Sequence, residues 1–174
     1  RLPTAAAAIL NPKRPDCDYP FDALAGVGVA FKLILALAIK NGLKTTDVFN
    51  QYVDIATLGT IADVVPLLGE NRVIVDKGLK ILHNPKRIGI RAIMEVAGVL
   101  DKPLNASTIA FSIAPRLNAA GRLGSAATAV ELLLTNDESR ARELALLLDT
   151  ENKERQQTER QIFDEALELI AKDP

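Results

Sequence analysis

Two arginines six positions apart stand out in residues 112–124, S-I-A-P-R-L-N-A-A-G-R-L-G, which we call the arginine motif. Arg116 and Arg122 carry planar guanidinium forks whose geometry matches phosphate oxygens. Asn118 adds a side-chain amide between them, and Gly121 allows a positive φ or a close approach to a ligand. The motif therefore indicates either a phosphate-binding segment or a solvated loop between helices that carries two surface arginines.

A carboxylate is the second candidate for chemistry. Asp63 follows residues 55–62, which are apolar except for Thr57, Gly59 and Thr60. A carboxylate at the end of a buried element costs free energy unless something compensates its charge. A role as a helix cap, a cationic partner or a bound metal ion would each provide that compensation. Hard metal cations prefer carboxylate oxygen as a ligand.

Composition limits the class of protein. The chain has 174 residues, 48% of them hydrophobic, which is enough for one domain with a core. Only 4% are aromatic, so stacking of bases on an aromatic platform cannot be the main means of binding. The single cysteine, Cys17, excludes an internal disulfide and fits a reducing cytoplasm, and the single histidine, His83, leaves little room for a histidine metal site. We expect no membrane span and no signal peptide.

Charge is unevenly distributed along the chain. The net charge is −1, but residues 71–122 carry nine basic and three acidic groups, and residues 123–174 carry six basic and twelve acidic groups. The basic block ends in the arginine motif and is what a polyanionic partner would use. For four of its members a solvated helix face is the favoured interpretation: Lys77, Lys80, Lys86 and Arg87.

The hydrophobic pattern predicts a mainly helical chain. Residues 5–10 resemble a short buried strand or an alanine-rich turn of helix, and residues 11–22 an exposed loop. A helix from position 22 or 24 to 41 is apolar on almost every side and should be buried. Further helices are expected over 45–61, 70–82, 89–97, 105–113 and 125–134. Asn105 and Ser107 are the candidate caps of the helix 105–113, and Ser125 is that of the last helix. Pro115 should end the fourth of these, which leaves the arginine motif as a loop.

The C-terminal part of the sequence predicts one long helix. Residues 137–170 contain neither proline nor glycine, and residues 149–161 contain no apolar side chain. A helix that is polar on all sides usually crosses solvent between domains. The alternatives are two helices with a kink near Thr150, or a charged helix docked on a partner.

Four ordered stretches resemble the RecJ family, the single-strand-specific exonucleases of the DHH phosphoesterase superfamily. They are N-P-K-R-P at 11–15, L-A-G-V-G-V-A-F-K-L at 24–33, L-G-T-I-A-D-V-V-P-L at 58–67 followed by G-E-N-R, and A-P-R-L-N-A-A-G-R-L-G at 114–124. The resemblance extends from about residue 2 to about residue 166. It implies an α/β parent domain, of which this piece should be mostly α-helical with at most a few short strands. Residues 1–136 would be the C-terminal part of the catalytic domain, and residues 137–174 a helix connecting it to a second domain.

The resemblance also implies an activity and its residues. A RecJ-like enzyme would hydrolyse single-stranded DNA from the 5′ end with two Mn²⁺ or Mg²⁺ ions. Asp63 resembles the last metal-binding aspartate of the superfamily, and Asp54 is the competing assignment. Arg116, Asn118 and Arg122 would contact the DNA backbone; in the alternative, the arginines pair with acidic residues of the long helix and hold the motif in place. A single-strand-binding protein and a helicase are possible partners, in the cytoplasm.

The sequence lacks the rest of the catalytic signature. No D-H-H triplet occurs, and Asp16-Cys17-Asp18 has the letters of D-x-D in the wrong order relative to where D-H-H should stand. We therefore expect a fragment that is inactive alone. Two other functions stay open: a related phosphohydrolase of oligoribonucleotides, cyclic dinucleotides or pyrophosphate, and a non-catalytic RecJ-like scaffold. The R-L-N-A-A-G-R stretch argues against the first, and Asp63 against the second.

Overall fold

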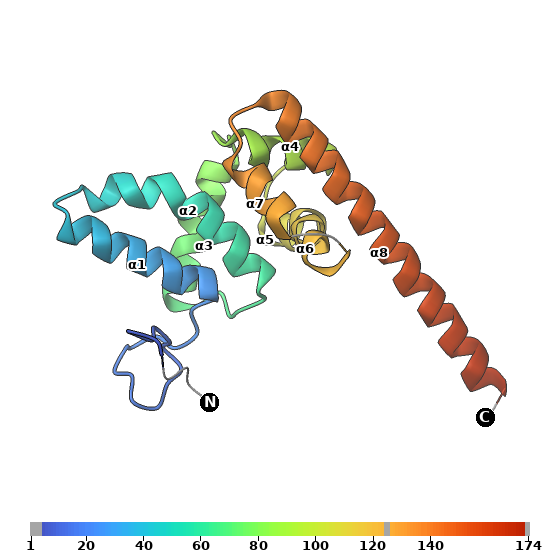
Figure 1. Ribbon diagram of the computed structural model, residues 1–174, viewed down its shortest axis with the longest axis horizontal. Helices are drawn as coiled ribbons and strands as arrows, with labels where there is room; N and C mark the ends of the chain where they lie inside the picture. Colours follow the sequence, from blue (N-terminus) through green and yellow to red (C-terminus); the bar gives the residue numbers. More distant parts are fainter. Residues whose placement is uncertain (1–4, 124–125, 173–174) are drawn as a thin grey trace. The chain divides into compact units, whose positions relative to one another are not determined.

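The structure is a computed structural model that describes residues 5–123 and 126–172, without the side chains of Ala120, Arg122 and Leu123 (Figure 1). Contacts between residues divide the chain into two units, Arg1–Leu82 and His83–Pro174. The described residues form helices, turns and loops without a strand, so the prediction of a mostly helical chain is confirmed. None of the described helices has the length and hydropathy that crossing a bilayer requires.

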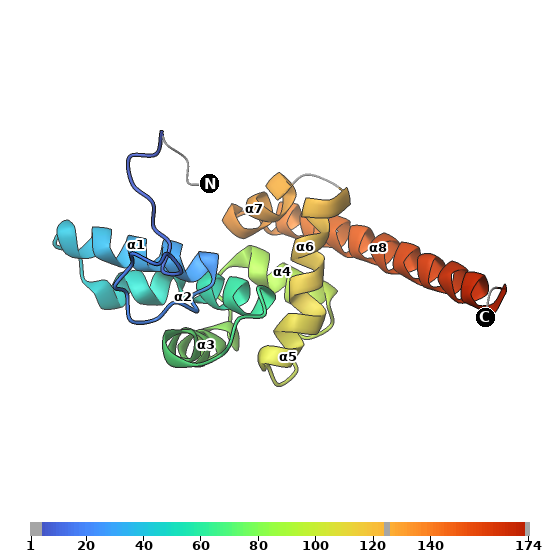
Figure 2. The ribbon, with the colours of Figure 1, turned by 90° about the horizontal axis from the view of Figure 1, so that it is seen from below.

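The first unit is built from α1 (Gly26–Lys40), α2 (Thr45–Ala62) and α3 (Gly69–Leu82), with α2 packed against both neighbours (Figures 1 and 2). Phe31 of α1 and Phe49 of α2 lie with ring centroids 5.2 Å apart. The core cluster draws on all three helices and on the segment before α1: Leu24, Phe31, Val53, Ala56 and Ile74.

Gly78 allows α2 and α3 to approach closely. A Cβ atom at this position would lie 1.7 Å from Thr57 Oγ1 and 2.9 Å from the Val53 carbonyl oxygen. Thr57 is fully buried, and its hydroxyl donates to the Ile74 carbonyl at 3.0 Å. The buried polar group is thereby satisfied across the helix pair, as burial requires.

In the second unit, α4 (Ile88–Val96), α6 (Ala114–Leu123) and α7 (Ala126–Leu134) pack against the N-terminal half of α8 (Glu138–Lys172) (Figure 2). Short α5 (Ala106–Thr108) and the π-helical turn η1 (Ile109–Ile113) lead directly into α6. The Asn105 side chain caps α5 by accepting from Thr108 N, as predicted. Ser125, the other predicted cap, lies outside the described residues. Buried apolar side chains of α8 supply one wall of the core: Ala141, Leu144, Ala145 and Leu148.

Residues 112–123 of the arginine motif are helical, so the prediction that Pro115 ends a helix and leaves the motif as a loop was wrong. The Ala114 N–H donates to the Ile109 carbonyl, five residues back, which makes a π turn directly before Pro115. Proline has no N–H to donate to a helix. The π turn shifts the backbone hydrogen bonds from four to five residues back at the position next to this missing donor, so the helix can continue through Pro115. Gly121 lies within α6 and has no positive φ, so of the two uses predicted for it only a close approach to a ligand stays open.

Two burial predictions were also wrong. Residues 5–10 form no strand and are mostly exposed, with Leu10 61% exposed. A strand needs a neighbour with which to pair its backbone, and the described residues offer none. On α1, Leu37 and Ile39 are 50% and 68% exposed, although the helix is apolar almost all round. Within this unit α1 packs mainly against α2.

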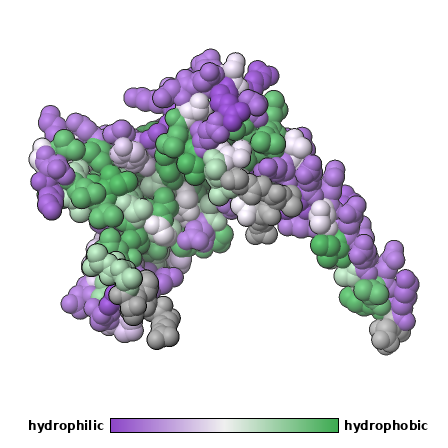
Figure 3. Space-filling model, viewed as in Figure 1, coloured by the Kyte–Doolittle hydropathy of each residue, from purple (hydrophilic) through white to green (hydrophobic). Residues whose placement is uncertain are grey.

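The long helix is confirmed. α8 runs for 35 residues without interruption, which corresponds to about 50 Å. The polar segment is not exposed from its beginning, however, because Asp149 and Asn152 are buried. All residues from position 156 to 172 are exposed, and Figure 3 shows apolar side chains again near the far end of the helix.

Candidate functional site

Asp63 lies at the C-terminal end of α2, where its backbone N–H donates to the Gly59 carbonyl at 3.1 Å. Its side chain is exposed and follows a buried helix. A carboxylate at a helix C-terminus is repelled by the negative end of the helix dipole, so the helix gains nothing from it. The next helix, α3, begins only at Gly69. Asp63 thus occupies the C-cap position of α2, but its carboxylate does not stabilise the helix end, and its role as a metal ligand remains a prediction.

The residue after Asp63 has a strained backbone. Val64 has φ 55°, the left-handed region that β-branched residues rarely enter. Its side chain is 86% exposed, so burial does not compensate the strain. Such a conformation costs about 1–3 kcal/mol, and residues of this kind cluster at functional sites. The strain marks the end of α2 as a candidate site independently of Asp63 itself.

Asn71 fixes the segment that follows Asp63. It lies in the first turn of α3, is fully buried, and donates through Nδ2 to the Pro66 carbonyl at 3.0 Å and to the Ala23 carbonyl at 2.7 Å. It thus holds the segment after Asp63 against the segment that enters α1. Asn71 lies within the predicted helix 70–82 and in the G-E-N-R stretch of the resemblance, but sequence reasoning gave this residue no role. The signal was present, because Asn71 lies on the helix face of the apolar positions 74, 75 and 78.

Asp54 is less suited to a shared site with Asp63. It is 6% exposed, and its Oδ1 atom accepts from the Ile55 N–H at 2.8 Å. Nine residues along an α-helix correspond to two and a half turns, so the two aspartates project from opposite sides of the helix and are separated by about 13 Å along its axis. The described residues bring together no group of three or more His, Cys, Asp or Glu side chains.

Arg116 is engaged within its own unit. Its Nε donates to Asp149 Oδ1 of α8 at 2.8 Å, and its Nη1 donates to the Ser112 carbonyl at 2.5 Å. The two side chains are 17% and 9% exposed. Of the two predicted roles, the structure forms the pairing with the long helix; a phosphate contact remains a prediction.

Asp149 is surrounded by positive charge. Lys153, one turn along α8, contacts its other carboxylate oxygen at 2.7 Å. Burial alone would raise the pKa of the Asp149 carboxyl, but the hydrogen bond from Lys153 and the charge of Arg116 outweigh burial and lower it. Asp149 therefore carries its negative charge at neutral pH.

The other two motif residues lie on a different side of α6. Asn118 is exposed, and position 122 follows it by one helical turn, on the same face. Position 116 lies about 120° round the helix from position 122. The Arg122 side chain lies outside the described residues. Asp63 belongs to the first unit and the arginine motif to the second.

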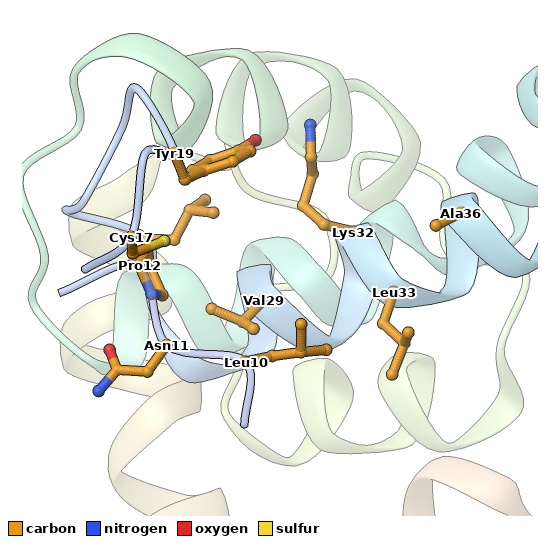
Figure 4. A pocket seen from close by; sticks show the side chains of 10 residues that line it. Leu10, Asn11, Pro12, Cys17, Tyr19, Val29, Lys32, Leu33 and Ala36 are labelled. Atoms are coloured by element: carbon orange, nitrogen blue, oxygen red, sulfur yellow. The ribbon is translucent and has the colours of Figure 1, made fainter. Parts of the chain in front are cut away.

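The first unit also contains an apolar pocket of about 320 Å³, shown in Figure 4. Apolar side chains of the N-terminal loop and α1 dominate its lining, including Leu10, Val29 and Leu33. None of the predicted site residues lines it.

The sequence matches proteins named single-stranded-DNA-specific exonuclease RecJ, whereas no protein-family model matches it. Identity to the Bacillus subtilis protein is 44% over 163 residues, which covers 94% of this chain and 20% of the relative. Identity to the Escherichia coli protein is 42% over 179 residues, which covers 97% of this chain and 31% of the relative. The chain thus spans about a fifth to a third of the relatives' length.

Solved structures agree with the sequence match. The crystal structure of Thermus thermophilus RecJ in complex with Mg²⁺ is 40% identical, with a TM-score of 0.77 over 85% of this chain and 23% of that one. A structure of exonuclease RecJ bound to manganese is 41% identical, with a TM-score of 0.74 over 82% of this chain and 35% of that one. Fold and sequence together show similarity to one part of proteins named as exonucleases. The particular resemblance predicted from the motifs, to RecJ, is confirmed.

Proposed function

We propose that this chain is part of a metal-dependent exonuclease that degrades single-stranded DNA in the 5′-to-3′ direction in repair and recombination. The match to RecJ proteins over nearly the whole chain supports the substrate and the reaction class. The observation that carries the proposal at residue level is Asp63, an exposed carboxylate at the C-terminal end of α2, next to strained Val64.

Asp63 is the proposed metal ligand. The RecJ structures with bound Mg²⁺ and Mn²⁺ support a hard divalent cation, for which a carboxylate is a suitable ligand. A pair of such ions supplies Lewis-acid activation of water and neutralises charge on the scissile phosphate. The role of this chain is to hold one carboxylate in a fixed place, through Asn71 and the segment that it ties down.

The arginine motif is the proposed DNA track. Asn118 and Arg122 would contact the sugar-phosphate backbone from one face of α6, and Arg116 from beside α8. Backbone contacts carry no sequence information, which suits an enzyme that must move along any strand. Residues 1–136 would complete a DHH-type α/β catalytic domain, and residues 137–174 would connect it to a second domain. The cytoplasm, a single-strand-binding protein and a helicase belong to the same proposal.

Asp63→Ala in the full-length protein tests the metal assignment. Digestion of long single-stranded DNA in Mn²⁺ or Mg²⁺ should be abolished, while binding of the same DNA in EDTA stays near that of the wild type. Asp47→Ala is the matched control, because Asp47 is an exposed acid in the first turn of the same helix. If Asp63→Ala digests DNA normally and Asp54→Ala does not, the wrong aspartate has been chosen. Preferred digestion of a dinucleotide would instead favour an oligoribonucleotide hydrolase.

A further inference from the structure

The contact between Arg116 and Asp149 links the arginine motif to the long helix. Arg116 extends from the first turn of α6, and Asp149 lies on α8 one position after buried Leu148. The pair spans 33 residues of sequence. Arg116 is a predicted DNA contact, and α8 is the helix predicted to connect this domain to a second one. The ion pair joins the two.

The geometry fixes the guanidinium plane. Asp149 accepts from Nε, and the Ser112 carbonyl accepts from Nη1 on the other side of the group. Because two of its nitrogens are bound to acceptors, the planar guanidinium group of Arg116 can take only one orientation. The Nη2 amino group is the part of the fork that these two contacts do not use. An arginine held in this way meets a phosphate without first losing side-chain freedom.

A gain in stability is a weak explanation for the Arg116–Asp149 ion pair. Burial of two charges costs solvation free energy that their attraction often only balances, and apolar replacements can be as stable. What a buried ion pair does provide is a defined geometry. Lys153 contributes to that geometry by holding the second oxygen of Asp149.

We propose that Asp149 is a positioning residue that orients Arg116 toward the phosphate backbone of single-stranded DNA and makes the arginine motif dependent on α8. The inference rests on the proposed function, because it presupposes that the motif contacts DNA. Asp149 itself touches no DNA. It acts through Arg116.

The charge of Asp149 and its contact with Arg116 predict opposite effects of Asp149→Asn on DNA binding. The substitution removes a negative charge beside the DNA track, so simple electrostatics would tighten binding. If Asp149 positions Arg116, binding should instead weaken, by roughly tenfold, because an oriented charge-assisted hydrogen bond is lost. The slope of log K against log salt should fall by up to about 0.7, the value for one phosphate contact on a single strand.

The experiment measures binding of a fluorescent single-stranded oligonucleotide to the full-length protein in EDTA, over a range of salt. Arg116→Ala, Asp149→Asn and the double variant form a cycle, and the double variant should bind no more weakly than Arg116→Ala. Glu131→Gln is the matched control, because it removes a pair between α7 and α8, Arg140 Nε to Glu131 Oε1 at 2.6 Å, that does not involve the motif. Its binding should match the wild type.

The outcomes separate the inference from the proposed function. Loss of binding in Asp149→Asn that disappears in the Arg116→Ala background supports the inference. Unchanged or tighter binding overturns it, as does a loss that is fully additive with Arg116→Ala. If Asp149→Asn fails to fold, Asp149→Glu keeps the charge and displaces the carboxylate, and should weaken binding in a folded protein. Failure of the wild type to bind single-stranded DNA would instead contradict the proposed function.

Discussion

At the scale of single residues, two unusual features lie close to the candidate metal ligand in the sequence. Val64 adopts φ 55° while almost fully exposed, and Asn71 donates through its amide to the carbonyls of Ala23 and Pro66. The two contacts of Asn71 hold the segment that follows Asp63 and Val64 in one place. A rigid frame of this kind keeps a ligand in place before a metal binds.

Val64→Gly should separate stability from function. Glycine enters the left-handed region without strain, so the free energy of unfolding should stay level or rise by up to about 1 kcal/mol. Turnover of single-stranded DNA should fall, because the freed backbone no longer fixes Asp63. Val73→Gly is the control: Val73 is half exposed within α3, and glycine there should destabilise by about 1 kcal/mol. A large loss of stability in Val64→Gly would argue against strain at this position.

At the scale of elements, the pattern of apolar residues located most helices because helix periodicity is a local property. The features that the pattern missed depend on which other segments pack against an element. The exposed face of α1 and the unpaired segment 5–10 could not be distinguished from buried elements, since apolar composition does not say what covers a surface. The π turn before Pro115 was missed because the usual effect of proline on the preceding residue ignores a change of hydrogen-bonding register.

The site residues were predictable to different degrees. Asp63 could be singled out because a charge that ends an apolar stretch is unusual in sequence. Asn71 was missed because an asparagine near a turn has many ordinary roles, and its two carbonyl acceptors come from other segments. The pairing of Arg116 with α8 could be named as an alternative, but the choice of Asp149 among the acidic residues of that helix required the packing of α6 on α8.

Gly78 provides the prediction for helix packing. In Gly78→Ala the new methyl group would overlap Thr57 Oγ1, 1.7 Å away, and meet the Val53 carbonyl oxygen, so α2 and α3 must separate. We expect a loss of about 1–3 kcal/mol in the free energy of unfolding, measured by chemical denaturation. Gly26→Ala is the control, because nothing lies within 4 Å of a Cβ there. Equal stability of both variants would show that the helices can move apart freely.

At the scale of the whole molecule, the chain holds one proposed metal ligand and a proposed DNA track, and it spans about a fifth to a third of its relatives' length. A two-metal site needs several carboxylate or histidine ligands to hold both ions. We therefore expect the isolated 174 residues to lack metal-dependent nuclease activity.

The purified chain, shown to be helical by circular dichroism, would be incubated with 5′-labelled single-stranded DNA and Mn²⁺ or Mg²⁺. The full-length protein under the same conditions is the positive control, and an Asp63→Ala version of the isolated chain controls for contaminating nuclease. Digestion by the chain that disappears in its Asp63→Ala version would show that these residues assemble a working site by themselves.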